Sequence, residues 1–155
     1  PFHVYGLGRP GLELARDTWE FSFDHPRQKR NFCWYQSLIY TADLGLTEEA
    51  RAFALEKFLW PNMRYPALYD TQGFCQRPDF DHGGSAMVGL QDMLMQIVDS
   101  KILLFSAWPK DWDCEFKLHA PSNTTVEGVL KAGKLERLAV TPEARAKDVV
   151  NMLGK

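Results

Sequence analysis

Two aspartates and one histidine, Asp79, Asp81 and His82, precede the pair Gly83-Gly84 and a long apolar segment. A helix that begins at this point would hold the three side chains rigidly and still let them face a cleft. Its first turn would also offer backbone N–H groups to a polar ligand. Carboxylates cap helices well, so two interpretations are open: Asp79 and Asp81 belong to a site, or they only cap the helix.

The chemistry that two carboxyl groups favour is acid–base catalysis. Their pKa values can differ when one group faces a cleft and the other caps a helix. Glycoside hydrolysis commonly uses one carboxyl as acid and another as base, several ångströms apart across the scissile bond. Asp79 and Asp81 are too close in sequence for us to assign them to that pair. If Asp79 is one partner, we expect the other elsewhere in the polypeptide.

Other motifs point to no further chemistry. The segment Gly6-Leu7-Gly8-Arg9-Pro10-Gly11 matches the dinucleotide-binding pattern, but no βαβ unit surrounds it, so a glycine-rich lead into a helix explains it better. The four histidines are dispersed, and no metal site is predicted. The sequence has no serine nucleophile elbow and no convincing Cys–His pair. We expect no cofactor.

Composition narrows the class of protein. The chain has 155 residues, 45% of them hydrophobic, and can bury roughly 68–70% of its unfolded surface. A net charge of -2 and a pI near 6.1 give no basic surface, so nucleic acid is not an expected partner. No apolar run approaches the ~18 residues that span a bilayer, so we predict no membrane segment. Three cysteines without CxxC spacing argue against a disulfide framework or a zinc ribbon.

The elements that must position these residues are helical in the first two-thirds of the chain. Helices are predicted from Pro10 onward, over about residues 31–44, from Thr47 through residue 58, and over about residues 84–98. Residues 59–77 contain prolines and aromatic side chains and are predicted as a long structured loop, a kind that is uncommon unless functional. The aromatic side chains there could stack on sugars, although such residues more often belong to a core.

After Asp99 the pattern changes to that of β-strands. Residues 101–105 form a short apolar run, while residues 114–119 and, more loosely, 125–130 alternate with a period of two. Ala132-Gly133-Lys134 predicts a hairpin turn, with its return strand over residues 135–140. Val149 and Val150 begin one more predicted strand. The sequence therefore predicts an α+β protein, with a helical part over residues 1–99 and a small antiparallel β-sheet or sandwich over residues 100–155.

The motif residues carry a resemblance to a known family. Asp79-Phe80-Asp81-His82-Gly83-Gly84, the following helix to Met93-Leu94-Met95-Gln96, and the segment 105–112 ending in Trp112 resemble the C-terminal end of bacterial glycosidases related to glycoside hydrolase family 95, the α-L-fucosidase and α-L-galactosidase family. In that family a motif D-x-N-F-G-G opens the helix, and L-P-A-L-P-x-x-W follows. Residues 31–45 resemble the family's G-W-S-x-A-W helix more loosely. The sequence is most similar to an uncharacterised branch with D-x-D-H-G-G followed by F-K-L-H-A-P.

The resemblance implies an (α/α)6 toroid followed by a β-domain, and an inverting hydrolysis in which Asp79 acts as base or positions water. Asp81 and His82, which replace the family's Asn and Phe, would bind sugar, as would the stacking residues Trp34 and Tyr69. The replacement puts fucose specificity in doubt. The general acid would lie upstream of this chain.

About four helices cannot close a toroid of twelve, so the chain is expected to be a C-terminal fragment that is inert alone. It would pack against the remainder of the polypeptide or a symmetry-related chain. The resemblance also implies a carbohydrate substrate and a periplasmic or secreted location. Two alternatives are a non-catalytic carbohydrate-binding or structural module on the same fold, and a lyase or epimerase.

Overall fold

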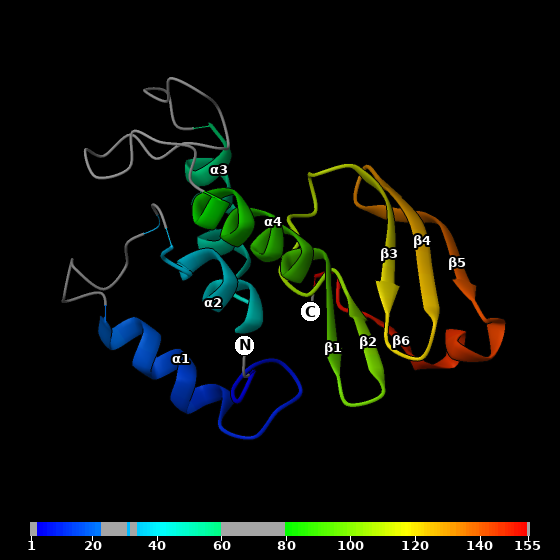
Figure 1. The fold of residues 1–155 in the computed structure, drawn as a ribbon, viewed down its shortest axis with the longest axis horizontal. Helices are drawn as coiled ribbons and strands as arrows, with labels where there is room; N and C mark the ends of the chain where they lie inside the picture. The colour runs from blue at the N-terminus through cyan, green and yellow to red at the C-terminus, as the bar shows by residue number, and fades with distance from the viewer. Residues whose placement is uncertain (1–2, 23–30, 32–33, 60–79, 155) are drawn as a thin grey trace.

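The structure, a computed structural model, describes residues 3–22, 31, 34–59 and 80–154. Its α-helices gather on one side of the molecule, and its strands lie on the other (Figure 1). The described helices are α1 (Leu12–Phe21), α2 (Ser37–Asp43), α3 (Thr47–Leu59), α4 (Phe80–Leu94) and the short 3-10 helix η2 (Glu143–Asp148). The predicted α+β class is confirmed.

The strands form two three-stranded sheets. In the first, β1 (Met95–Val98) pairs antiparallel with β2 (Lys101–Leu104), and β2 pairs in parallel with β6 (Val149–Asn151). In the second, β3 (Cys114–Ala120), β4 (Thr124–Lys131) and β5 (Lys134–Thr141) form an antiparallel meander. Ala132 and Gly133 connect β4 to β5 with φ angles of 47° and 70°, and a two-residue hairpin turn needs positive φ at both positions.

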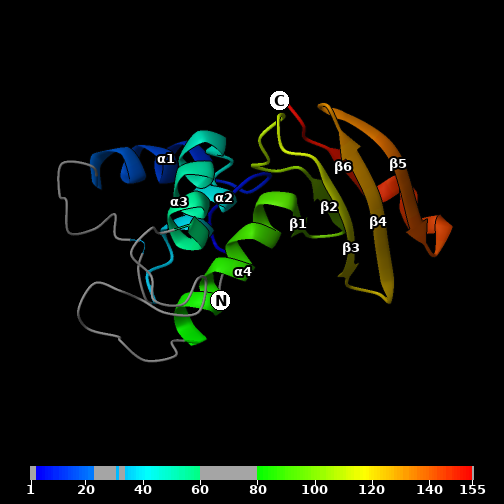
Figure 2. The ribbon, with the colours of Figure 1, turned by 90° about the horizontal axis from the view of Figure 1, so that it is seen from above.

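Helix α4 connects the two sides of the molecule. It packs against α2 and α3 and then continues directly into β1 (Figure 2). Gly89 allows this close approach, because a Cβ atom there would lie 2.4 Å from Leu38 Cγ. Helix α2 is joined to α3 by a short turn in which Gly45 adopts a φ of 70°, the left-handed conformation typical of a residue that follows a helix.

One hydrophobic core runs through both parts of the chain. It includes Leu38 on α2 and Ala54 on α3, and also Ile102 and Val126 in the two sheets. Between the sheets, Phe105 meets Phe116 edge to face with ring centroids 6.0 Å apart. The helical and β parts that the sequence distinguishes therefore share buried surface, and each stabilises the other.

Four predicted helix limits were wrong. Helix α4 begins at Phe80 and not near residue 84. Residues 95–98 form β1 rather than the end of α4, because their backbone pairs with β2 across a turn where Asp99 has a φ of 53°. Helix α2 begins at Ser37 and not near residue 31. The helix predicted from Pro10 begins at Leu12, after Gly11 with a φ of 77°, and has no buried residue.

Candidate functional site

The start of α4 carries the residues that the sequence motif singles out. Asp81 lies exposed in the first turn, whereas the His82 side chain is only 3% exposed. His82 Nε2 lies 3.1 Å from the backbone carbonyl of Lys57 on α3, to which it can donate a hydrogen bond. The first turn of α4 is thus held against α3 by a buried imidazole.

Lys57 strengthens the same contact. Its side chain is 1% exposed, and Nζ donates to Ser85 Oγ at 2.7 Å. Ser85 in turn donates to the backbone carbonyl of His82 at 3.2 Å. Burying an ammonium group is unfavourable unless polar groups compensate it, and Ser85 Oγ is one such group here. Because Lys57 is on α3 and Ser85 is on α4, this hydrogen bond ties α3 to the start of α4.

The remaining predicted site residues lie elsewhere or outside the described residues. Asp79 and Tyr69 both fall within residues 60–79, which lie outside them. Trp34 stands before α2, with its side chain 60% exposed and its ring stacked on Tyr35 at a centroid distance of 5.8 Å. The assignment of Asp79, Tyr69, Trp34, Asp81 and His82 to catalysis or sugar binding stays a prediction.

A second cluster, which the sequence motifs do not indicate, lies at the other end of α4. Asp43 ends α2, and its Oδ2 lies 2.9 Å from His3 Nδ1 in an ion pair. The backbone carbonyl of Asp43 also accepts a hydrogen bond from the Leu7 amide at 2.9 Å. Asp43 therefore fastens the N-terminal segment to α2 through both its side chain and its backbone.

Asp92, on α4, faces this cluster. Burial, followed by the charge of Asp43, raises the Asp92 pKa from 3.8 to about 7. Burial also raises the pKa of Asp43, and the charge and hydrogen bond of His3 partly oppose that rise. Asp92 Oδ2 is buried and has no hydrogen-bond partner among the described residues. Near neutral pH, Asp92 can therefore hold a proton next to the carboxyl group of Asp43. Neighbouring carboxyl groups with perturbed pKa values are typical of acid–base sites.

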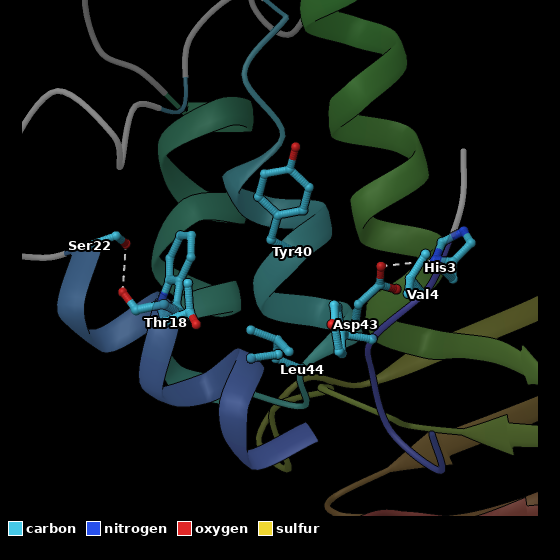
Figure 3. Close-up of a pocket in the computed structure, with 10 residues that line it drawn as sticks. His3, Val4, Thr18, Ser22, Tyr40, Asp43 and Leu44 are labelled. Atoms are coloured by element: carbon cyan, nitrogen blue, oxygen red, sulfur yellow. Dashed lines mark hydrogen bonds and ion pairs between the residues drawn. The ribbon is translucent and has the colours of Figure 1, made fainter. Parts of the chain in front are cut away.

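Two pockets share His3, Tyr5 and Asp43. The pocket on the α4 side has a volume of about 280 Å³ and is also lined by Asp92, Gln96 and His119. The other has a volume of about 390 Å³ and lies between the N-terminal segment, α1 and the end of α2 (Figure 3). Both are concave surfaces of a size that small ligands use.

The two clusters are separate sites. Asp92 follows Asp81 by eleven positions on α4, which at a rise of about 1.5 Å per residue places them about 16 Å apart along the helix axis. In the part of the chain that the structure describes, no three His, Cys, Asp or Glu side chains are arranged to hold a metal ion. The sequence signal for the second cluster was an aspartate within the apolar segment of α4, and sequence reasoning missed it.

No protein-family model and no curated protein sequence matches this chain. Among the described residues, no helix is long and apolar enough to cross a membrane.

Proposed function

We propose that this chain is the C-terminal part of a glycoside hydrolase whose helices belong to an (α/α)6 toroid. In this proposal Asp79 is the base or positions the attacking water of an inverting reaction, and Asp81 contacts the sugar. The general acid comes from residues outside these 155, and the enzyme works in the periplasm or outside the cell.

The observation that carries the proposal is the anchored start of α4. Because α4 begins at Phe80, Asp79 directly precedes a helix whose first turn is tied to α3 by His82 and Lys57. A hydrolytic carboxylate must be held within a fraction of an ångström of its productive position, and a rigid supporting layer does this. A helix cap alone would not need a buried lysine beneath it.

The burial of His82 also agrees with the motif. The family that the sequence resembles has Phe at this position, between Asn and the Gly-Gly pair. A side chain that packs against α3 can be Phe or His, provided that the imidazole finds a hydrogen-bond acceptor, which here is the Lys57 carbonyl. The change from Phe to His is therefore compatible with the same backbone arrangement.

The toroid proposal is supported by the second face of α4. One face, with His82, Ala86, Gly89 and Met93, is buried. The opposite face carries exposed apolar side chains at helical spacing, namely Phe80, Met87 and Val88. A helix that is apolar on both faces is typically packed on both sides, as the helices of a toroid wall are. Further helices of the same polypeptide would cover this face.

The test is hydrolysis of a broad glycan panel by the longest natural polypeptide that contains this chain, with Asp79→Asn beside the wild type. We expect Asp79→Asn to lower turnover by about 10²-fold or more with folding intact. The matched control is Asp17→Asn, an exposed carboxylate on α1, which should leave turnover unchanged. Equal turnover by Asp79→Asn and wild type would overturn the assignment of Asp79. No turnover by either would favour a non-catalytic carbohydrate-binding or structural module.

A further inference from the structure

We propose that the pocket in Figure 3 is a second carbohydrate-binding site, which holds one sugar ring between α1, the end of α2 and the N-terminal segment. The inference rests on the proposed function for its substrate class. Among the described residues, none from α4 lines this pocket, so the two ideas can fail separately.

The pocket is lined by three aromatic side chains, two of which pack against neighbouring residues. Tyr5, Trp19 and Tyr40 all line it. Gly11 makes room for Tyr5, because a Cβ there would lie 2.8 Å from Tyr5 Cε1. Trp19 meets Phe53 edge to face at a centroid distance of 6.0 Å. Flat aromatic faces that are already ordered bind the apolar face of a ring at a low entropic cost.

The walls of the pocket are joined to one another. The Arg16 guanidinium, on α1, donates from Nε and Nη2 to the Leu44 carbonyl at 3.0 and 2.8 Å. Leu44 itself lines the pocket. This contact holds α1 at a fixed position beside the end of α2, and the His3–Asp43 pair holds the N-terminal segment on the other side. The pocket is therefore formed before any ligand arrives.

Polar groups stand on two sides of this aromatic surface. Figure 3 shows the His3–Asp43 pair on one side and Thr18 and Ser22 on the other. Within the described residues, His3 Nε2 and Asp43 Oδ1 make no hydrogen bond. The hydroxyls of Thr18 and Ser22 donate to backbone carbonyls at 2.7 and 2.6 Å, which leaves their oxygens able to accept.

These groups suit a neutral sugar better than other classes of ligand. No lysine or arginine is among the described residues that line the pocket, and Asp43 would repel a phosphate or carboxylate. A wholly apolar ligand would bury the His3–Asp43 pair without partners, which is unfavourable. A sugar ring offers an apolar face to the aromatic side chains and hydroxyl groups to both polar sides. The volume of about 390 Å³ is near the lower end of small-molecule sites, as one ring requires.

The experiment titrates the ¹⁵N-labelled chain with D-galactose, L-fucose, D-xylose and lactose, and separately with tetramethylammonium as a cationic probe. At least one sugar should shift the amide signals of residues 3–5, 15–22 and 40–44. Tyr40→Ala should weaken that binding about tenfold or more, because it removes one stacking face. Leu14→Ala removes an exposed apolar side chain from α1 that does not line the pocket, and it should bind as the wild type does.

Several results would overturn the proposal. These are binding of none of the sugars by a folded chain, sugar binding that Tyr40→Ala leaves unchanged, and preference of the pocket for tetramethylammonium. If the isolated chain gives the spectrum of an unfolded protein, the same two variants are compared in the longer polypeptide by ligand-observed NMR, with Asp79→Asn present to prevent turnover. Hydrolysis that depends on Asp79 without sugar binding here would overturn this inference alone. Sugar binding here without hydrolysis would leave it standing and overturn the catalytic proposal.

Discussion

Asp92 makes the stability of this protein depend on pH in a direction opposite to that of most carboxylates. Its pKa is raised to about 7 by burial and by the charge of Asp43. Between about pH 4 and pH 7, the folded chain therefore keeps a proton on Asp92 that the unfolded chain has already released. Because the folded state binds more protons in that range, the free energy of unfolding must fall as pH rises.

The size of this effect follows from the two pKa values. A rise from 3.8 to about 7 corresponds to about 4 kcal/mol, at about 1.4 kcal/mol for each pH unit by which a pKa moves. Asp92 remains partly exposed, so solvent screening reduces the expected contribution to about 2 kcal/mol. This stabilisation is fully present below about pH 4 and is lost once the pH exceeds about 7.

Asp92→Asn isolates this contribution, because an amide keeps the shape of the protonated carboxyl but does not ionise. As the pH is raised from about 4 to 8, the free energy of unfolding of the variant should rise by about 2 kcal/mol relative to that of the wild type. This corresponds to about 4–8 °C in melting temperature. Urea unfolding followed by circular dichroism measures the difference at each pH. The amide itself could lower the stability by the same amount at every pH. Such a constant loss does not affect the test, which measures how the difference between variant and wild type changes with pH. Asp17→Asn is the control and should follow the wild type. A difference between Asp92→Asn and wild type that does not vary with pH would refute the reasoning.

Three further substitutions test the packing. Gly89→Ala would place a Cβ 2.4 Å from Leu38 Cγ and should destabilise the chain by about 1–3 kcal/mol in urea unfolding; an unchanged midpoint would show that α2 and α4 can separate freely. His82→Ala should cost about 1–3 kcal/mol by the same measurement, because it removes a buried hydrogen bond, and no loss would contradict its anchoring role. His3→Ala should change global stability by less than about 1 kcal/mol, since the ion pair is half exposed. It should nevertheless speed amide exchange at Leu7, and unchanged exchange would mean that the N-terminal segment is held without the ion pair.

The β part of the fold was predictable because its signals are local. Alternation over residues 114–119 and the turn at Ala132-Gly133 predict β3 and the β4–β5 hairpin, and both are confirmed. The parallel pairing of β2 with β6 was not predicted. Its two strands are separated by more than forty residues, and nothing in a short apolar run specifies a partner so far along the chain.

The junction of α4 and β1 shows where local patterns fail. Residues 95–98 are apolar except for Gln96 and suit a buried helix or a buried strand equally well. The decision comes from tertiary pairing, because Met95 lies opposite Leu104 and Val98 opposite Lys101. Short apolar segments take the structure that their surroundings impose, and sequence alone could not supply those surroundings.

The two candidate sites also differ in how far the sequence alone could reveal them. The motif from Asp79 to Gly84 could be found because its residues are contiguous. The His3–Asp43–Asp92 cluster could not, since three separate segments bring these side chains together. Asp92 gave the only local signal, a charged residue within an apolar helix. Such a residue indicates a perturbed pKa, although it does not identify the neighbours that cause it.

Gly84 offers a test that separates stability from function. It lies near the start of α4. Apart from its chain neighbours and the adjacent helix backbone, no described heavy atom lies within 4 Å of the Cβ that a substitution would add. Alanine is the better helix former, so Gly84→Ala should stabilise the chain by about 0.5–1 kcal/mol. Folding of the described residues therefore does not require glycine at position 84. Its presence is explained if a ligand or another segment, outside the described residues, approaches the helix there.

In the proposed enzyme that space, beside Asp81 and just after Asp79, would admit either the sugar or the neighbouring wall of the toroid. Gly84→Ala should then lower hydrolysis by the longer polypeptide even as it raises the urea midpoint of this chain. Ser85→Ala is not a suitable control, because Ser85 contacts Lys57; Met87→Ala, on the same exposed face, is the better one. A Gly84→Ala variant that is more stable and fully active would show that the space is unused and that the glycine pair of the motif has no part in the site.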